Sequence, residues 1–169
     1  PGGNTVTTAE HAISLLLALA RNIPQGTASL KEGRWAKKAL MGVELTGKTL
    51  GVVGLGAIGS LVAEMALTLG MDVVGYDPAL SVEAAWRLSS QVRRADTLSA
   101  LFARCDYITL HLPVLDSTRG LVNSELLGAV RPDTCLLNFA RQEIIEIMRV
   151  VGATDVYIRT PFLVEGVGQ

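Results

Sequence analysis

The segment from Gly54 to Gly59 constrains the fold of this chain more than any other. It reads Gly-Leu-Gly-Ala-Ile-Gly, follows the β-branched run Thr49 to Val53, and opens a stretch with apolar residues at helical spacing as far as Leu69. A strand, a glycine turn of this spacing and a helix together predict the phosphate-binding turn of a dinucleotide-binding βαβ unit.

Each glycine of this turn has a separate expected task. Gly54 permits the tight turn, Gly56 lets the backbone approach a pyrophosphate, and Gly59 allows close packing of helix on strand. We expect the amides of Ala57 and Ile58 to face the phosphates, because the helix N-terminus favours an anion.

An acidic residue, Asp77, follows the next apolar run, Met71 to Tyr76, and lies 18 residues after Gly59. This is close to the spacing of the carboxylate that binds the ribose hydroxyls of a dinucleotide. A carboxylate repels a 2′-phosphate, and Pro78 follows it where an NADP site often has an arginine. The sequence therefore predicts NAD. The alternative is that Asp77 only caps a turn and that the glycines only shape a βα junction.

Strand and helix patterns alternate from residue 47 to residue 158, which predicts an α/β fold with a Rossmann-type, doubly wound parallel sheet. The later strands are expected at Gln91–Arg93, Tyr107–Leu112, Thr134–Asn138 and Val156–Ile158. Helices are expected after caps at Ser81, Thr97 and Ser124, and a last helix over Glu143–Val150.

Residues 1–46 are expected to form an N-terminal helix and an arm for dimerisation. Thr7 to Glu10 has the form of a capping box, which predicts a helix from Thr7 to just before Pro24. Ile13 to Ala20 is apolar nearly all round, and such a helix is buried on more than one side. The connection from Gln25 to Thr46 is expected to lack regular structure apart from a helical patch around Trp35.

Composition narrows the possible functions. Hydrophobic residues make up 49% and charged residues 18% of the 169 positions, and the formal net charge of −1 gives no overall attraction to nucleic acid or an anionic membrane. The apolar stretch Ala12 to Ala20 is too short to span a bilayer. Cys105 and Cys135 match no metal-ligand spacing and are expected to be reduced packing residues. We expect a cytoplasmic protein without a metal site.

Two further predicted strands end in residues suited to a ligand, because a doubly wound sheet binds at the carboxyl ends of its strands. His111 ends the first, and Leu112 and Pro113 offer an apolar wall for a ring. His111 could be an acid–base group or a structural histidine with a local hydrogen bond. Arg141, after the second, suits a substrate carboxylate, although a solvated surface arginine is equally consistent with the sequence alone.

Several segments, in order, resemble the D-2-hydroxyacid dehydrogenase family, and most closely its phosphoglycerate-oxidising branch. The resemblance covers about residues 4 to 141 and rests on Pro24–Trp35, Gly42–Gly51, the glycine turn, Gly75–Pro78, His111–Pro113, Thr118–Asn123 and Asn138–Arg141.

The resemblance implies a Rossmann domain that binds NAD and forms a homodimer through its N-terminal helix and arm. It implies that Arg141 is the catalytic arginine that binds a small 2-hydroxyacid. The implied reaction is oxidation of 3-phosphoglycerate to 3-phosphohydroxypyruvate in serine biosynthesis. The predicted cofactor contacts are Gly54, Gly56, Ala57, Ile58, Gly59, Asp77, Leu112, Pro113, Phe139, Ala140, Arg141 and Asp155.

The sequence also departs from the family pattern. Gln142 stands where a glycine is expected after Arg141, Thr160 occupies the position of the catalytic glutamate, and no histidine follows His111 to serve as general acid and base. The substrate domain is expected to be absent, and residues 159–169 match nothing in the family. We therefore expect an NAD-binding domain that is inactive alone. The alternatives are a standalone NAD-binding or oligomerisation module with a regulatory or scaffold role, and a small complete dehydrogenase that uses His111.

Overall fold

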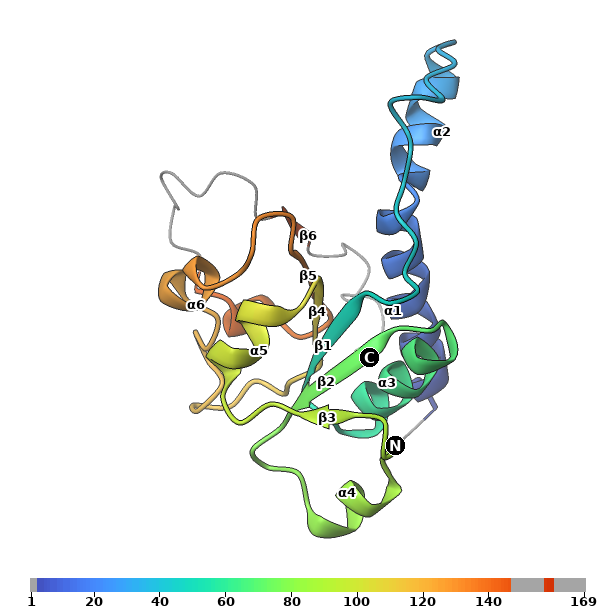
Figure 1. The fold of residues 1–169 in the computed structure, drawn as a ribbon. Helices are drawn as coiled ribbons and strands as arrows, with labels where there is room; N and C mark the ends of the chain where they lie inside the picture. Colours follow the sequence, from blue (N-terminus) through green and yellow to red (C-terminus); the bar gives the residue numbers. More distant parts are fainter. Residues whose placement is uncertain (1–2, 147–156, 160–169) are drawn as a thin grey trace.

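The computed structural model describes residues 3–146 and 157–159 of the chain. Within them, strands form one sheet in the order β3-β2-β1-β4-β5-β6, and every neighbouring pair is parallel (Figure 1). This is the order of a doubly wound dinucleotide-binding sheet, in which the strand order reverses between β1 and β4. The predicted Rossmann-type fold is confirmed. The strands are β1 (Thr49–Val53), β2 (Asp72–Tyr76), β3 (Arg93–Arg94), β4 (Tyr107–Leu110), β5 (Cys135–Asn138) and β6 (Tyr157–Arg159).

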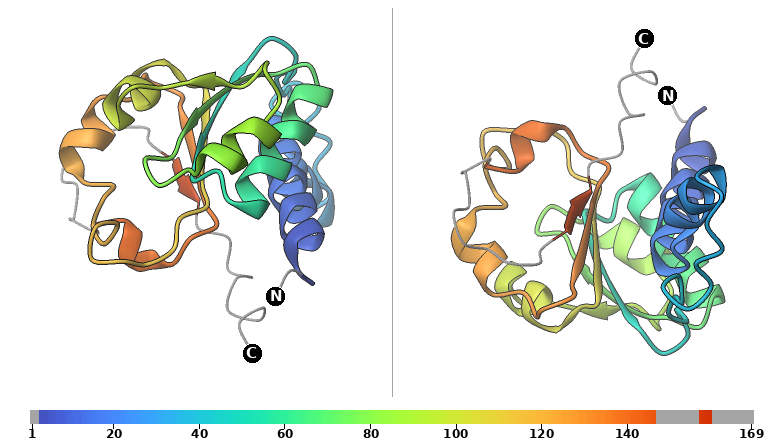
Figure 2. Two further views of the ribbon diagram at one scale, coloured as in Figure 1. Left: turned by 90° about the horizontal axis from the view of Figure 1, so that it is seen from below. Right: turned by 90° about the horizontal axis from the view of Figure 1, so that it is seen from above.

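Helices cover both faces of the sheet (Figure 2). Helices α1 (Thr5–Ala20) and α3 (Ala57–Thr68) share one apolar core with one face of the strands, whereas α5 (Leu98–Arg104) and α6 (Ser124–Gly128) share a second core with the other. Strands β1, β2, β4 and β5 are mostly buried between these two cores, which explains their continuous apolar runs. The short helix α4 (Val82–Arg87) follows β2 and buries none of its residues.

The predicted helix starts were right at two positions and one residue late at a third. Ser81 accepts a hydrogen bond from Ala84 N at 3.1 Å and Thr97 accepts one from Ala100 N at 3.1 Å, which confirms both caps. The cap of α6 is Asn123, whose Oδ1 accepts from Leu126 N at 2.9 Å, and not Ser124. Asparagine and serine are both good caps, so the sequence alone does not decide between neighbours.

The predicted capping box at Thr7 is wrong. Helix α1 begins at Thr5 with Asn4 at its N-cap, and Thr8 N already donates to Asn4 O at 2.9 Å. Thr7 therefore lies inside the first turn, where it cannot take the extended conformation of a cap. The helix buries one stripe of small and apolar side chains, Ala9, Ala12, Leu16 and Ala20.

The expectation of an irregular connection after Pro24 is also wrong. A second helix, α2 (Ile23–Lys31), follows α1 directly, and Pro24 lies in its first turn, where the missing N–H has no partner to lose. Asn22, with φ of 53°, separates the two helices. The helical patch expected around Trp35 is absent from the described chain, which is irregular there and turns at 37–40.

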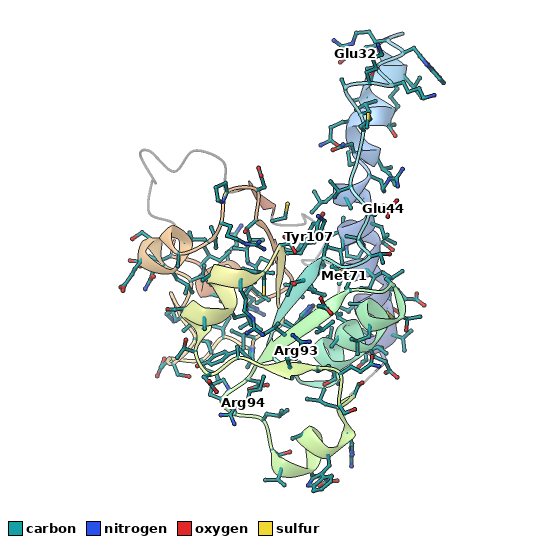
Figure 3. The ribbon with its side chains drawn as sticks, in the orientation of Figure 1. Glu32, Glu44, Met71, Arg93, Arg94 and Tyr107 are labelled. Carbon is teal, nitrogen blue, oxygen red and sulfur yellow. The ribbon has the colours of Figure 1, made fainter. Side chains whose placement is uncertain are left out.

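Residues 21–44 form a projecting arm, with Glu32 near its tip and Glu44 near its base (Figure 3). The returning segment packs closely on the end of α1. Val43 N donates to Ala20 O at 2.9 Å, and a Cβ at Gly42 would lie 2.3 Å from that same carbonyl oxygen. The close approach fixes where the arm leaves the domain.

The helix predicted over Glu143–Val150 is not present in the described residues. A single 3₁₀ turn, η1 (Gln142–Ile144), is followed by Ile145, which forms a parallel bridge with Val122. The pairing with Val122 excludes the predicted helix here, because Glu146 N donates to Val122 O at 2.9 Å and not to a carbonyl of the preceding turn. Residues 147–150 lie outside the described part of the chain.

Candidate nucleotide-binding site

The glycine turn joins β1 to α3 through two close backbone approaches. Gly54 has φ of +93°, and a Cβ there would lie 2.5 Å from His111 O. A Cβ on Gly59 would lie 1.9 Å from Gly54 O, so the helix rests directly on the turn. Side chains at either position are excluded by backbone atoms, as the sequence predicts.

Gly56 differs from the other two glycines. It is the N-cap of α3 with φ of −69° and ψ of −163°, a conformation open to any residue, and a Cβ there would meet nothing within 4 Å. In the described structure no side chain caps α3, and its first turn holds no acidic residue. The first amides of the helix therefore face an open, electropositive space that suits a phosphate group.

Asp77 lies directly beside this turn. Its Oδ2 accepts a hydrogen bond from Leu55 N at 2.9 Å, and its Oδ1 accepts one from Ala79 N at 3.0 Å. The carboxylate thus caps the turn after β2 and also ties it to the glycine turn. An ionised carboxylate has about four acceptor positions, so two remain for ribose hydroxyls. The capping role and the predicted ribose role are compatible.

The loop after β4 closes the other side of the glycine turn. His111 N donates to Val53 O at 2.8 Å, and Leu112 Cδ2 would lie 3.2 Å from a Cβ on Gly54. The His111 ring stacks on Phe139 with centroids 5.4 Å apart and planes 6° from parallel, and its Nε2 pairs with Thr109 Oγ1 at 2.8 Å. These contacts connect the loop after β4 to the loop after β5 at the edge where the strand order reverses.

Burial lowers the pKa of His111 from 6.5 to about 4. The ring is therefore neutral at neutral pH, and its contacts are those of a structural histidine. This favours the local hydrogen-bonding interpretation over an acid–base role.

The lowered pKa of His111 gives a pH dependence of stability. Between pH 6.5 and about 4, His111 is protonated in the unfolded chain but not in the folded chain. The stability of the fold therefore includes the full contribution of neutral His111 above pH 6.5 and loses it as the pH falls towards 4. Relative to His111→Gln, the wild type should lose up to about 3 kcal/mol of unfolding free energy across that interval. Denaturant titrations of both proteins at several pH values measure the difference, and parallel curves would refute it.

Arg141 stands between two fixed segments. It is exposed and serves as the N-cap of η1. Before it, Ala140 N donates to Asn138 Oδ1 at 2.9 Å; after it, Gly120 N donates to Glu143 O at 2.7 Å and Val122 N to Ile144 O at 3.0 Å. The backbone around Arg141 is held on both sides, and its side chain is exposed.

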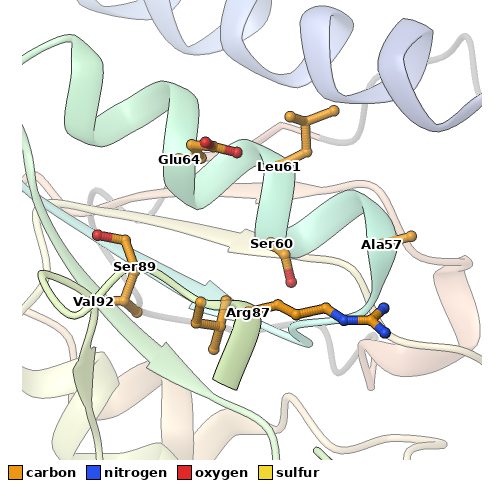
Figure 4. Close-up of a pocket in the computed structure, with 8 residues that line it drawn as sticks. Ala57, Ser60, Leu61, Glu64, Arg87, Ser89 and Val92 are labelled. Carbon is orange, nitrogen blue, oxygen red and sulfur yellow. The ribbon is translucent and has the colours of Figure 1, made fainter. Parts of the chain in front are cut away.

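A separate cavity of about 410 Å³ lies between α3 and the segment from α4 to β3 (Figure 4). Of the predicted cofactor residues, only Ala57 contributes to its walls. The cavity therefore adjoins the glycine turn and does not include Asp77, Leu112 or Phe139. Its lining residues are Ala57, Ser60, Leu61, Glu64, Arg87, Leu88, Ser89 and Val92.

In the described part of the chain, no group of three or more His, Cys, Asp or Glu side chains could hold a metal ion, and no helix has the length and apolar character needed to cross a membrane. Burial raises the pKa of Cys105 to about 11, so its thiol stays protonated in the core.

The structure brings most of the predicted site residues to one edge of the sheet. Contacts join the glycine turn to Asp77, to the loop with Leu112 and, through His111, to Phe139 and the Arg141 loop. Pro113 is exposed beside Leu112, and Asp155 lies outside the described residues. Sequence reasoning missed Asn138, which is fully buried. A polar residue ending an apolar strand was the available signal.

Comparison with known proteins decides the family. Residues 13–155 match the NAD binding domain of the D-isomer specific 2-hydroxyacid dehydrogenases. The chain belongs to this family. The resemblance seen in the sequence is confirmed, and so is NAD as the cofactor of the matched domain.

Curated relatives of this dehydrogenase domain include D-3-phosphoglycerate dehydrogenases. The Synechocystis sp. enzyme is 42% identical over 155 residues, which are 92% of this chain and 27% of that protein. The Archaeoglobus fulgidus enzyme is 44% identical over 146 residues, 86% of this chain and 27% of that protein. The chain thus spans about a quarter of the length of these relatives.

Solved structures agree. A phosphoglycerate oxidoreductase from Vibrio cholerae superposes with a TM-score of 0.77 at 34% identity, over 85% of this chain and 45% of that one. D-lactate dehydrogenase from Aquifex aeolicus, complexed with NAD and lactic acid, superposes with a TM-score of 0.74 at 28% identity, over 82% and 41% respectively.

Proposed function

We propose that this chain is the NAD-binding domain of an oxidoreductase similar to D-3-phosphoglycerate dehydrogenase, which oxidises 3-phosphoglycerate to 3-phosphohydroxypyruvate. The identity of over 40% to several such enzymes carries the proposal. The geometry supports it, because an uncapped helix, an open Gly56 and a strand-end carboxylate are the features that a dinucleotide requires.

Each part of the site has a task under this proposal. NAD, when bound, would supply the hydride acceptor. The first amides of α3 bind its pyrophosphate and Asp77 accepts hydrogen bonds from its adenosine ribose. Leu112 and Phe139 shield a ring of the cofactor from water. The Arg141 guanidinium binds the carboxylate of the hydroxyacid with two parallel N–H donors.

We infer that the chain binds the cofactor without sustained turnover on its own. Thr160 at the position of the catalytic glutamate and the lack of a histidine after His111 leave this chain without the acid–base pair expected in the family, and neutral, half-buried His111 is a poor substitute. A steady-state assay with 3-phosphoglycerate and NAD should show no turnover. Turnover that disappears in His111→Gln would overturn this inference.

Replacing Asp77 tests the cofactor assignment. Asp77→Asn should weaken NADH binding by about 10- to 100-fold, because charge-assisted hydrogen bonds to the ribose are lost. It should also narrow the preference for NADH over NADPH, since the repulsion of a 2′-phosphate disappears. Calorimetric titration with both cofactors measures the two effects. Equal NADH affinity in wild type and variant would contradict the ribose role.

We also propose that the chain forms a homodimer, and that the arm (residues 21–44) and α1 together make the dimer interface. Large apolar side chains on the arm are exposed, with Leu30 at 59%, Trp35 at 81% and Met41 at 78% of their full areas. Aromatic residues and methionine are enriched at protein interfaces. Sedimentation should show a dimer for the wild type and a monomer for Trp35→Asp combined with Met41→Asp. Glu32→Gln, near the same tip, is the control, and a monomeric wild type would refute the proposal.

A further inference from the structure

Asn138 is a polar side chain with no exposed area at the end of β5. The strand pairs it with Leu110 of β4, and the next amide, Phe139 N, donates to Leu110 O at 3.1 Å. Asn138 is thus placed within the sheet, immediately before the turn that leads to Arg141.

The two polar atoms of this side chain have different surroundings. Oδ1 accepts the hydrogen bond from Ala140 N at 2.9 Å, which closes a turn two residues long. Nδ2 is buried and has no hydrogen-bond partner among the described residues. A buried unpaired donor destabilises a fold, whereas an apolar side chain of similar volume at that position avoids this loss.

The turn that Asn138 closes presents Arg141. Phe139 is held by its stacking on His111, Ala140 by Asn138, and the segment after Arg141 by the bridge between Val122 and Ile145. Without the Asn138 bond, the backbone between the stacked ring and the bridge loses its one side-chain tether in the described structure.

We propose that Asn138 is a positioning residue: it sets the Phe139–Arg141 turn for ligand binding, and does so at a cost to stability. The proposal rests on the NAD-binding function proposed above. A positioning role and a merely structural role predict different results. If Asn138 positions the turn, removing its amide group should weaken NADH binding without lowering the stability of the fold.

Asn138→Leu, which keeps the volume and removes both polar atoms, is the decisive variant. We expect NADH affinity about tenfold weaker and an unfolding midpoint equal to or higher than that of the wild type. Hydrogen exchange of the Ala140 amide, followed by nuclear magnetic resonance, should accelerate at least tenfold while that of Leu137 is unchanged. Asn138→Ser restores an acceptor for Ala140 N and should recover most of the protection and the affinity.

The outcomes separate the two proposals. A wild type that fails to bind NADH refutes the proposed function, while exchange at Ala140 still tests the turn. Wild-type affinity in Asn138→Leu, or unchanged protection of Ala140, overturns the positioning role and leaves the proposed function intact. A clear loss of stability in both Asn138→Leu and Asn138→Ser would show an ordinary structural residue.

Discussion

Replacing Gly56 by alanine should weaken NADH binding by about 10- to 100-fold while leaving the stability of the protein unchanged. A Cβ at this position meets no protein atom within 4 Å, and the backbone conformation is open to alanine. The added methyl group therefore meets no steric obstacle in the free protein. It occupies the space at the start of α3 through which a pyrophosphate approaches the backbone.

Titration calorimetry and thermal unfolding, applied to the same samples, test this separation. Gly128→Ala is the matched control, because a Cβ there also meets nothing within 4 Å and the residue lies in α6, on the opposite face of the sheet from α3. It should bind NADH as the wild type does. Undiminished NADH affinity in Gly56→Ala would show that the cofactor does not contact this turn.

Gly59→Ala should instead damage the fold and the site together. Its Cβ would lie 1.9 Å from Gly54 O and 2.9 Å from Gly54 C, and both are backbone atoms that no rotamer change can move. The helix must lift from the turn, at a cost of about 3 kcal/mol, as for severe overpacking. NADH binding should fall by more than in Gly56→Ala, because the amides at the start of α3 move with the helix.

Denaturant unfolding of the three alanine variants provides the measurement. We expect a lowered midpoint with an unchanged slope for Gly59→Ala and the wild-type midpoint for the other two variants. A Gly59→Ala protein as stable as the wild type would mean that α3 does not rest on the turn in solution.

The sequence predicted the sheet and the glycine turn because their determinants are local. Gly54 and Gly59 are required where one backbone segment touches another, and that requirement appears as a fixed spacing in the chain. The caps at Ser81 and Thr97 are local in the same sense, since each bonds an amide three residues away. Short-range constraints of this kind can be seen in one sequence.

The features that were missed depend on contacts between distant residues. A proline can either end a helix or occupy the first turn of one. Here Pro24 begins α2, and Asn22 just before it is held by a distant contact, because its Nδ2 donates to Met41 O at 3.1 Å. Asp77 itself was predicted, but its hydrogen bond from Leu55 N, 22 positions away, was not. The helix predicted after Glu143 yields to pairing with Val122, which no local pattern shows. The bond from Ala140 to Asn138 is local, but its importance comes from Arg141 and from burial by remote segments.

Helix α1 has a consequence for how such a domain can be exchanged between genes. Its Ala9 and Leu16 belong to the same core as Leu50 of β1, and His11 meets Phe139 edge-on at 6.1 Å, beside the ligand edge. A recombination breakpoint just before β1 would remove the α1 side chains from one face of the sheet and the His11 contact from Phe139. No residue from 21–44 belongs to that core. An exchangeable unit of this fold therefore has to include the helix that precedes the nucleotide motif, not only the sheet and the glycine turn.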